Sequence, residues 1–201
     1  MKIICIGRNY SAHAKEMGSS VPKEPIFFLK PDSAILPKRN PFYIPDFSQE
    51  IHYEIELVIK IKKLGKSINL EYAKDYYSDI GLGIDFTARD LQENCKKLGR
   101  PWEIAKAFDQ SAVISEKFIN INSLEDINFS LKKNGEIVQS SNIMKMIFSP
   151  DQIIHYVSKF MTLKIGDLIF TGTPSGVGPI KIGDKLEGFI NEKKMLSLNI
   201  R

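Results

Sequence analysis

The stretch that decides the fold is Ile51-His52-Tyr53-Glu54-Ile55-Glu56-Leu57-Val58-Ile59. It is rich in β-branched residues and alternates as a β-strand does, which places on one face the side chains of Tyr53, Ile55, Leu57 and Ile59. Because side chains at i and i+2 point the same way, the other face carries His52, Glu54 and Glu56. Two carboxylates on one face of so apolar a strand either face water or share a cation, since like charges close together repel.

A second apolar run, residues 80–87, carries one acid, Asp85, among hydrophobic residues and glycines. Together with Glu54 and Glu56 it would form an oxygen site of the kind that suits Mg²⁺ or Mn²⁺. The alternative for the two glutamates is a solvated outer face. Acids presented by strands leave coordination positions for water and for a chelating substrate, so the pattern favours a metal site at which chemistry takes place.

The composition is that of an ordinary globular protein, with 201 residues, 43% hydrophobic and 26% charged residues, and a formal net charge of +4. There is no basic stripe interleaved with aromatics and no run of about 20 apolar residues, so we expect neither a nucleic-acid partner nor a membrane span. Cys5 and Cys95 stand in no metal-type spacing, and the N-terminal apolar run is too short for a signal peptide. We therefore expect a cytoplasmic, single-domain protein over residues 1–201.

The patterning predicts a mostly β protein with short helices, of the α+β class. We expect strands over residues 2–6, 26–29, 51–62 and 80–86, β structure from Val113 onward, and a hairpin turning at Asn134-Gly135. The proline-rich segment within residues 9–45 keeps a high apolar content, so it either packs on the core or moves over the site as a lid.

The helix signals are local. A short helix capped by Asn9 or Ser11 ends at Gly18, and another covers residues 69–78. A third covers residues 87–98, with Thr87 as N-cap and Gly99 as its stop. The last covers residues 151–160, with Ser149 as cap and Pro150 at the first position. Residues 99–110 are expected to be irregular.

Further candidate site residues lie outside the acidic strands. His13 and Glu16 are three apart on the first helix, which makes them neighbours and a candidate general-base pair; a surface ion pair is the alternative. Lys106, between two alanines, would be a buried cation that steadies an anionic substrate, or else a surface lysine. The glycine-rich loop 171–178 offers backbone N–H groups to a carboxylate or phosphate, but it lacks the lysine of a P-loop, so nucleotide binding is unsupported.

Taken together, these segments resemble the fumarylacetoacetate hydrolase superfamily along nearly the whole chain. The resemblance is carried by Gly7-Arg8-Asn9-Tyr10 with His13 and Glu16, Phe28-Leu29-Lys30-Pro31, His52-Tyr53-Glu54-Ile55-Glu56-Leu57, Gly83-Ile84-Asp85-Phe86-Thr87-Ala88-Arg89-Asp90, Pro101-Trp102-Glu103-Ile104-Ala105-Lys106-Ala107-Phe108-Asp109 and Thr171-Gly172-Thr173-Pro174-Ser175-Gly176-Val177. The short length is similar to that of the acylpyruvate hydrolase and oxaloacetate decarboxylase branch.

The resemblance implies a mixed β-roll or β-sandwich fold of the superfamily's C-terminal-domain type, a homodimer, and Mg²⁺ or Mn²⁺ held by Glu54, Glu56 and Asp85. It also implies a catalytic His13–Glu16 pair on a helix that orders when substrate binds, with Lys106 beside the metal. Substrate-contacting positions are implied for Lys30, Arg89, Gln92 and Thr173.

The function expected from this resemblance is cleavage of a C–C bond in small 2-oxo acids through a metal-bound pyruvate enolate, as acylpyruvate hydrolysis or oxaloacetate decarboxylation. His13 and Glu16 would activate water, and Lys106 would hold the developing negative charge. Two alternatives stay open. One is an isomerase or decarboxylase of unsaturated 2-oxo diacids of the 2-hydroxyhepta-2,4-diene-1,7-dioate type, with His13 moving a proton. The other is a non-enzymatic β-rich binding protein with a structural cation.

Overall fold

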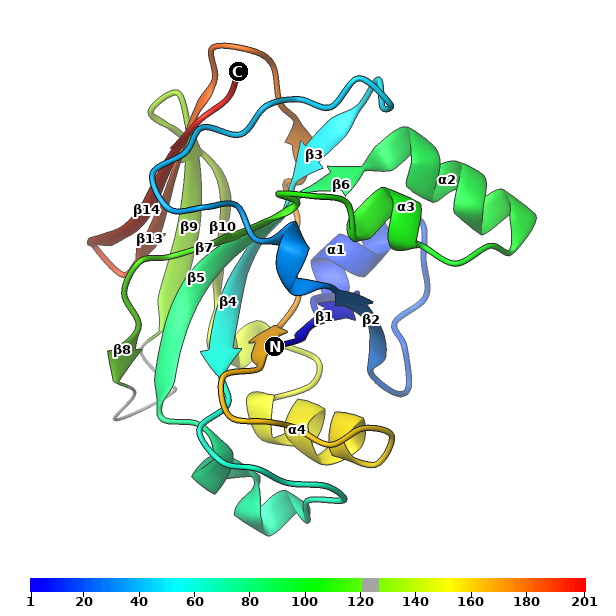
Figure 1. The fold of residues 1–201 in the computed structure, drawn as a ribbon, viewed down its shortest axis with the longest axis vertical. Coiled ribbons are helices and arrows are strands. Elements are labelled where there is room, and N and C mark those ends of the chain that lie inside the picture. The colour runs from blue at the N-terminus through cyan, green and yellow to red at the C-terminus, as the bar shows by residue number, and fades with distance from the viewer. Residues whose placement is uncertain (121–126) are drawn as a thin grey trace.

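The computed structural model describes residues 1–120 and 127–201 and is built of curled sheets with short helices against them (Figure 1). The apolar run after Glu54 forms β4 (Ile55–Lys60), inside a seven-stranded sheet. The order of this sheet is β2 (Ile26–Lys30), β1 (Ile3–Gly7), β11 (Leu168–Phe170), β4, β5 (Asp79–Asp85) and β7 (Ala112–Ile114), with β8 (Ile119–Asn120) also paired to β5. β1 and β11 pair in parallel and the other pairs are antiparallel, so the sheet is mixed.

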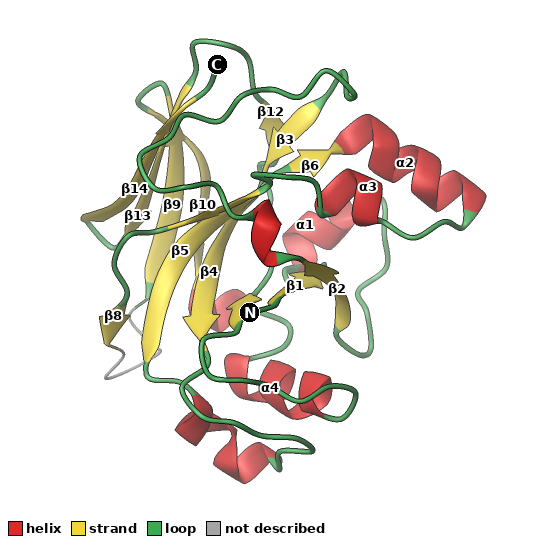
Figure 2. Ribbon diagram, viewed as in Figure 1, coloured by secondary structure: helices red, strands yellow, loops and turns green. Residues whose placement is uncertain are grey.

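Two smaller sheets complete the β structure. The four-stranded sheet is ordered β10 (Glu136–Asn142), β9 (Asn128–Lys133), β13 (Lys185–Ile190) and β14 (Lys193–Asn199), and it packs beside β4 and β5 (Figure 2). The three-stranded sheet is ordered β12 (Gly178–Pro179), β3 (Ile51–Tyr53) and β6 (Thr87–Ala88). The mostly β architecture with short helices confirms the expected fold class.

The helices cover the sheet edges and one sheet face. They are α1 (Ser11–Glu16), α2 (Arg89–Leu98), α3 (Glu103–Lys106) and α4 (Pro150–Ser158), together with the 3₁₀ turns η1 (Asp32–Ala34), η2 (Leu70–Tyr76) and η3 (Ile143–Lys145). In the part of the chain that the structure describes, no helix is long and apolar enough to span a membrane.

The core explains why β4 is apolar on both faces. One face packs Leu57 with Leu82 and, across to the four-stranded sheet, Leu131 and Leu186. Further along the same face, Ile59 belongs to a second cluster beneath α4 and η2, formed with Ile4, Ile6, Ile61, Ile68, Ala73, Tyr77, Ile153, Ile154, Val157, Leu163 and Ile169. The other face packs Val58 in a third cluster, with Ile3, Cys5, Ala112, Leu168 and Phe170. A strand buried on both faces is a rigid support for any side chain that it presents.

Several expected elements are confirmed. Asn134 and Gly135, with φ of 54° and 90°, form the turn between β9 and β10. Ser149 caps α4 in a capping box with Gln152, and Pro150 is the first helical residue. Gly99, with φ of 62°, ends α2. The β expectation from Val113 onward includes residues 121–126, which lie outside the described residues.

Other expectations are wrong. The strand over 51–62 is not continuous: it breaks at Glu54, because β3 pairs with β6 and β12 whereas β4 pairs with β5 and β11. Thr87 is not an N-cap, because it belongs to β6 and α2 begins at Arg89. Residues 69–78 hold a 3₁₀ helix of seven residues, and the supposedly irregular segment 99–110 contains α3.

The cap expected for the first helix is also wrong. Tyr10 is the N-cap of α1, and neither Asn9 nor Ser11 caps it by a side chain. The Asn9 side chain instead donates to the carbonyls of Phe148 and Thr171 and accepts from the Phe148 N–H. The Asn9 side chain, expected to cap the helix locally, therefore forms long-range hydrogen bonds instead.

Candidate active site

Three buried carboxylates meet where β3 passes into β4. Glu54 lies at the break, Glu56 is on β4, and Asp85 is the last residue of β5. The backbone N–H of Asp85 donates to the Glu54 carbonyl at 2.9 Å. One carboxylate oxygen from each lies within 4.8 Å of the others, and the residues are 5%, 2% and 1% exposed. The solvated-face alternative for Glu54 and Glu56 is therefore wrong. His52, expected on the same face, does not line the pocket beside the carboxylates: its Nε2 lies 2.7 Å from Glu50, and its Nδ1 lies 3.4 Å from Arg89 Nε.

Buried cations surround two of the three carboxylates. Lys106, 3% exposed, donates from Nζ to Glu54 Oε2 at 2.9 Å and to Asp85 Oδ2 at 2.8 Å, so the surface-lysine alternative is wrong. Arg89 donates to Glu54 Oε1 at 2.6 Å and to the Gln92 side chain at 2.6 Å. Although burial opposes it, Lys106 and Arg89 hold the pKa of Glu54 well below its usual value. The two acids in turn raise the pKa of Lys106, against the effect of burial.

Lys30 lies behind Asp85. Its ammonium is 2.8 Å from Asp85 Oδ1, and its other partners are the Ser111 hydroxyl and the backbone carbonyls of Phe86, Ser111 and Lys106. The Lys30 side chain is fully buried, so its ammonium is fully engaged by the protein. It does not line the pocket beside the carboxylates.

Glu56 is the acid that the described residues leave without a cation. Its one hydrogen bond is from the Gly172 N–H, at 2.7 Å to Oε2. Burial, together with the charges of Asp85 and Glu54, raises the pKa of Glu56 well above its usual value. The buried Asp85 Oδ1, in contrast, is paired with the Lys30 ammonium at 2.8 Å. A buried acid without a compensating cation, beside two further carboxylates, fits a divalent ion such as Mg²⁺ or Mn²⁺, which oxygen ligands bind.

The His13–Glu16 pair lies beside this cluster and is tied to the glycine-rich loop. His13 Nδ1 is 3.0 Å from Glu16 Oε2, and Glu16 Oε1 accepts from the Gly176 N–H at 3.0 Å. His13 is 6% exposed and lines the pocket beside the carboxylates. The pair therefore has one end in the site and one at the surface, where a third of the Glu16 side chain is exposed.

The loop 171–178 is held close to the acidic cluster. Thr173 donates to the Ile55 carbonyl at 2.9 Å and lines the same pocket. Gly172 has φ of 101°, and a Cβ there would lie 2.6 Å from the Asn9 Cβ, so a glycine is required at this position. This close approach places the Gly172 N–H against Glu56.

Sequence reasoning missed several residues that organise the site. The Thr87 hydroxyl accepts from Lys106 and donates to Glu54 at 3.0 Å. The Gln139 amide links the Ile55 N–H to the Thr173 hydroxyl. Ser111 holds Lys30. Each is a single polar residue without a repeating pattern, although Thr87 is only two residues after Asp85 and binds the same Lys106 ammonium.

The pocket beside the carboxylates is small, about 30 Å³, which admits little more than a water molecule or two. It brings together most of the predicted site residues, whereas Lys30 and Glu16 do not line it. Its walls are Ile6, Gly7, Arg8, His13, Met17, Phe28, Glu54, Glu56, Asp85, Arg89, Gln92, Lys96, Trp102, Lys106 and Thr173.

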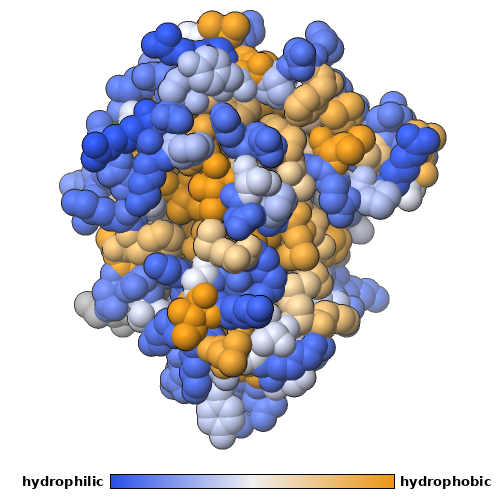
Figure 3. Space-filling model, in the orientation of Figure 1, coloured by the Kyte–Doolittle hydropathy of each residue, from blue (hydrophilic) through white to orange (hydrophobic). Residues whose placement is uncertain are grey.

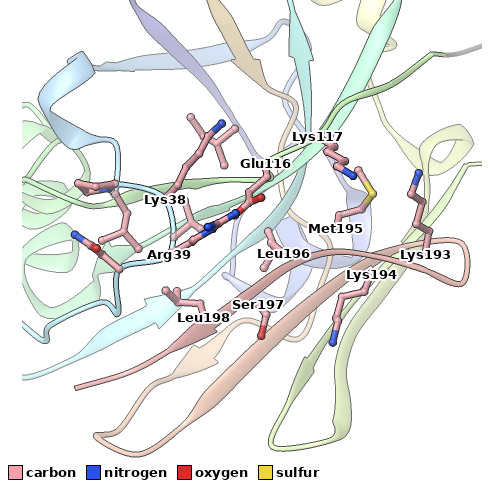
Figure 4. A pocket seen from close by; sticks show the side chains of 15 residues that line it. Lys38, Arg39, Glu116, Lys117, Lys193, Lys194, Met195, Leu196, Ser197 and Leu198 are labelled. Atoms are coloured by element: carbon pink, nitrogen blue, oxygen red, sulfur yellow. The ribbon is translucent and has the colours of Figure 1, made fainter.

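A larger cavity of about 350 Å³ lies elsewhere, between residues 36–40, β7 and β14 (Figure 4). Among its lining residues, Arg39 and Glu116 form an exposed ion pair, with Nε 3.3 Å from Oε1. None of the predicted site residues lines it. The face in Figure 3 shows hydrophobic side chains framed by hydrophilic ones.

Comparisons with known proteins agree with this geometry. The family model described as fumarylacetoacetate (FAA) hydrolase C-terminal matches residues 2–200. The oxaloacetate tautomerase FAHD1, mitochondrial, of Mus musculus is 46% identical over 192 residues, covering 94% of this chain and 86% of the relative. The oxaloacetate decarboxylase, mitochondrial, of Dictyostelium discoideum is 45% identical over 190 residues, covering 92% and 87%.

A solved structure is also similar. The fumarylpyruvate hydrolase from Pseudomonas aeruginosa in complex with Mn²⁺ and pyruvate has a TM-score of 0.92 and 40% identity, covering 100% of this chain and 89% of that one. This likeness over the whole chain confirms the expected roll-type fold.

Proposed function

The chain belongs to the fumarylacetoacetate hydrolase family, and from this premise we propose that it is a divalent-metal-dependent enzyme that cleaves a C–C bond in small 2-oxo acids. The reactions are acylpyruvate hydrolysis and oxaloacetate decarboxylation. The observation that carries the proposal is the buried cluster of three acids, in which Glu56 has no cationic partner among the described residues. A purely structural cation would have no need of the His13–Glu16 pair beside it.

Glu54, Glu56 and Asp85 are the proposed ligands of Mg²⁺ or Mn²⁺. When bound, the ion supplies Lewis-acid polarisation of the 2-oxo group. The similar fumarylpyruvate hydrolase, which holds Mn²⁺ and pyruvate, supports a divalent ion here. A 2-oxo acid offers two adjacent oxygens, its carboxylate and its keto group, which match the positions that three protein ligands leave open.

Lys106 stabilises the negative charge that develops on the substrate when the bond beyond C3 breaks. Its ammonium is buried and already bound to Glu54 and Asp85, so it is held in place before the reaction and needs no reorganisation. Thr87 fixes the position of this ammonium from the other side.

His13 and Glu16 activate the water that attacks the distal carbonyl of an acylpyruvate. The carboxylate accepts from or orients His13 Nδ1, which leaves Nε2 as the ring nitrogen available for proton transfer. In oxaloacetate decarboxylation no water attacks, so the pair has no proton to remove.

Arg89, Gln92 and Thr173 line the pocket and are the proposed substrate contacts. Arg89 already binds Glu54, so it contacts substrate with the donors that remain. The burial of Lys30 favours a positioning role instead, in which its ammonium orients Asp85.

A second candidate is proton transfer on an enolisable or unsaturated 2-oxo diacid, in which no carbon–carbon bond is cleaved. The tautomerase name of the mouse relative supports it.

The lid, narrower than the expected segment 9–45, comprises α1 and residues 17–25. β2 is anchored by its pairing with β1, and Phe42 stacks on Phe86 with ring centroids 4.1 Å apart, so the rest of the segment is held by the core. The single domain over 1–201, the homodimer and the cytoplasmic location stay predictions. Light scattering after gel filtration tests the dimer.

The test of function is pyruvate release from a panel of 2-oxo acids, with Mg²⁺, Mn²⁺ or EDTA. We expect turnover of acetylpyruvate or oxaloacetate with either metal and none with EDTA. Because free metal ions decarboxylate oxaloacetate slowly, the matched blank contains the Glu56→Gln variant in place of the wild type. Turnover undiminished by EDTA, or exchange at C3 without pyruvate release, would reject cleavage; the second outcome would favour the proton-transfer candidate.

A further inference from the structure

Two basic side chains on the wall of the carboxylate pocket have no role in holding the site together. Arg8 and Lys96 both line the pocket, and within the described residues neither forms a hydrogen bond or an ion pair with an acid. The other cations of the site, Lys30, Arg89 and Lys106, are each bound to a carboxylate of the cluster. The protein therefore places two uncompensated positive charges beside a site already rich in lysine and arginine.

Lys96 continues a polar row along α2. Arg89, Gln92 and Lys96 are spaced by three and four residues, which puts them on one helix face. Arg89 touches Glu54, Gln92 touches Arg89, and Lys96 follows one turn further out. Its Nζ lies 5.8 Å from the centroid of the Trp102 ring, which lines the pocket as well. The row leads from the metal ligands toward the outer part of the pocket.

Arg8 comes from a different element than Lys96, and its backbone conformation is fixed. It follows β1 with φ of 59°, a left-handed conformation that few non-glycine residues adopt. The next residue, Asn9, is pinned by its hydrogen bonds to Phe148 and Thr171. Strained backbone of this kind persists where the surroundings hold it and gathers at functional sites.

The two side chains lie close enough to affect one another. Burial and the like charges of Arg89 and Arg8 lower the pKa of Lys96. Arg89 is compensated by Glu54, so the net positive charge in the outer pocket comes from Arg8 and Lys96. An anionic group bound between them would relieve this repulsion.

We propose that Arg8 and Lys96, beside Trp102, form a subsite for the distal carboxylate of the substrate, and that the enzyme prefers 2-oxo diacids to 2-oxo monoacids. This rests on the proposed function, since the 2-oxo end must sit at the carboxylate cluster. Lys96 is seven residues beyond Arg89, about 10 Å along the helix axis, so the subsite suits diacids longer than the four-carbon oxaloacetate. The flat, planar guanidinium and the compact ammonium bind the two oxygens of one carboxylate from two sides.

The test is binding of a matched pair, 2-oxoadipate and 2-oxohexanoate. Both have six carbons and a 2-oxo acid end, neither has the 1,3-dicarbonyl group needed for cleavage, and only the first has a distal carboxylate. Titration calorimetry with the wild-type protein and Mn²⁺ should give a dissociation constant about three- to tenfold lower for 2-oxoadipate. The difference should shrink as salt is raised, because partly exposed charges are screened.

The variants separate the subsite from the rest of the pocket. Arg8→Gln and Lys96→Gln should each weaken 2-oxoadipate binding and leave 2-oxohexanoate unchanged, and Lys96→Glu should make the diacid the weaker ligand. Lys97→Gln is the control, because Lys97 has the same charge on the same helix and does not line the pocket. Equal binding of both acids by the wild type, or equal losses for both in the variants, would overturn the subsite alone. No binding of either acid would overturn the subsite together with the proposed function.

Discussion

The Lys106 ammonium lies 2.9 Å from Glu54 Oε2, inside the group of carboxylates proposed to hold the metal. A cation at this position offsets the repulsion between Glu54 and Asp85 and also lowers the net negative charge that a divalent ion would meet. In the proposed mechanism, Lys106 therefore acts on the substrate at some expense to metal affinity, and metal affinity can be measured separately from turnover.

Lys106→Met should lower kcat for acetylpyruvate and for oxaloacetate by about 10²–10³-fold. The reason is that both substrates develop the same negative charge, on the pyruvate enolate that forms when the bond beyond C3 breaks. Mn²⁺ affinity, measured by calorimetry, should stay equal or rise. Lys97→Gln serves as the charge-matched control at the surface. Turnover within twofold of wild type would show that Lys106 has only a structural role.

Glu56→Gln should lower Mn²⁺ affinity by at least about tenfold. This is the smallest loss usually seen when a residue that only supports a metal ligand is replaced, and a ligand itself should matter at least as much. The metal-free variant should unfold at a temperature equal to or above that of wild type, because it removes a buried charge that no described cation compensates while an amide oxygen can still accept from Gly172. Calorimetry and thermal unfolding in EDTA measure the two effects. Glu116→Gln, an exposed acid paired with Arg39, is the control. Unchanged metal affinity would remove Glu56 from the ligand set.

How much of this site the sequence predicts depends on how local the determining pattern is. The apolar, alternating runs were enough to place Glu56 and Asp85 on strands with Glu54 beside them, and the Asn134-Gly135 turn follows from the dihedral angles those residues tolerate. The break at Glu54 was not predictable in this way, because it arises from pairing of β3 with β12, more than 120 residues later.

Single polar residues show the same limit. Gln139 and Ser111 lie in segments that read only as β structure or loop, and their partners Ile55, Thr173 and Lys30 are distant in sequence. Asn9 looked like a helix cap because a capping motif is local, yet its bonds to Phe148 and Thr171 are the ones that form. Such roles follow only from the assembled sheets.

Ligand binding should order the lid. With Mg²⁺ and oxalate, which resembles the planar enolate of pyruvate, amide hydrogen exchange should slow over α1 and residues 17–25 and change little in β4. The hydrogen bond from Gly176 to Glu16 is the contact that closure would retain. Peptides from α4, which packs against η2 on the far sheet face, serve as the internal control. Identical exchange with and without oxalate would reject the lid.

Asp167→Asn should destabilise the protein at neutral pH and lose this effect in acid. Burial acts to raise the Asp167 pKa, but hydrogen bonds from Lys2 and from the Lys164 and Lys2 amides lower it below the usual value. A depressed folded-state pKa means that the stabilisation is complete above the unfolded pKa, near 3.9, and disappears as pH falls through the folded pKa.

Thermal and urea unfolding at pH 6, 4 and 3 measure this prediction. The variant should be less stable by about 1–3 kcal/mol at pH 6, the usual range for hydrogen bonds to a charged group, and the gap should close toward pH 3. Asp109→Asn, at an exposed position, supplies the control. A gap that stays constant over this pH range would mean that the charge of Asp167 does not carry its contribution.

The sharpest prediction concerns how strongly each of the two reactions depends on the His13–Glu16 pair. Glu16→Gln keeps an oxygen that can accept from Gly176 and so leaves α1 attached to the loop, but it removes the charge 3.0 Å from His13 Nδ1. Only hydrolysis needs an activated water, so kcat for acetylpyruvate should fall by about 10²–10⁴-fold in Glu16→Gln and in His13→Ala, and kcat for oxaloacetate should fall much less. Glu192→Gln, at an exposed acid outside the lid, should change neither rate. Steady-state kinetics on both substrates with saturating Mg²⁺ makes the comparison. Equal losses for both substrates would mean that the pair closes or shapes the site, and the water-activating role would have to be abandoned, because a general base for water has no task in decarboxylation.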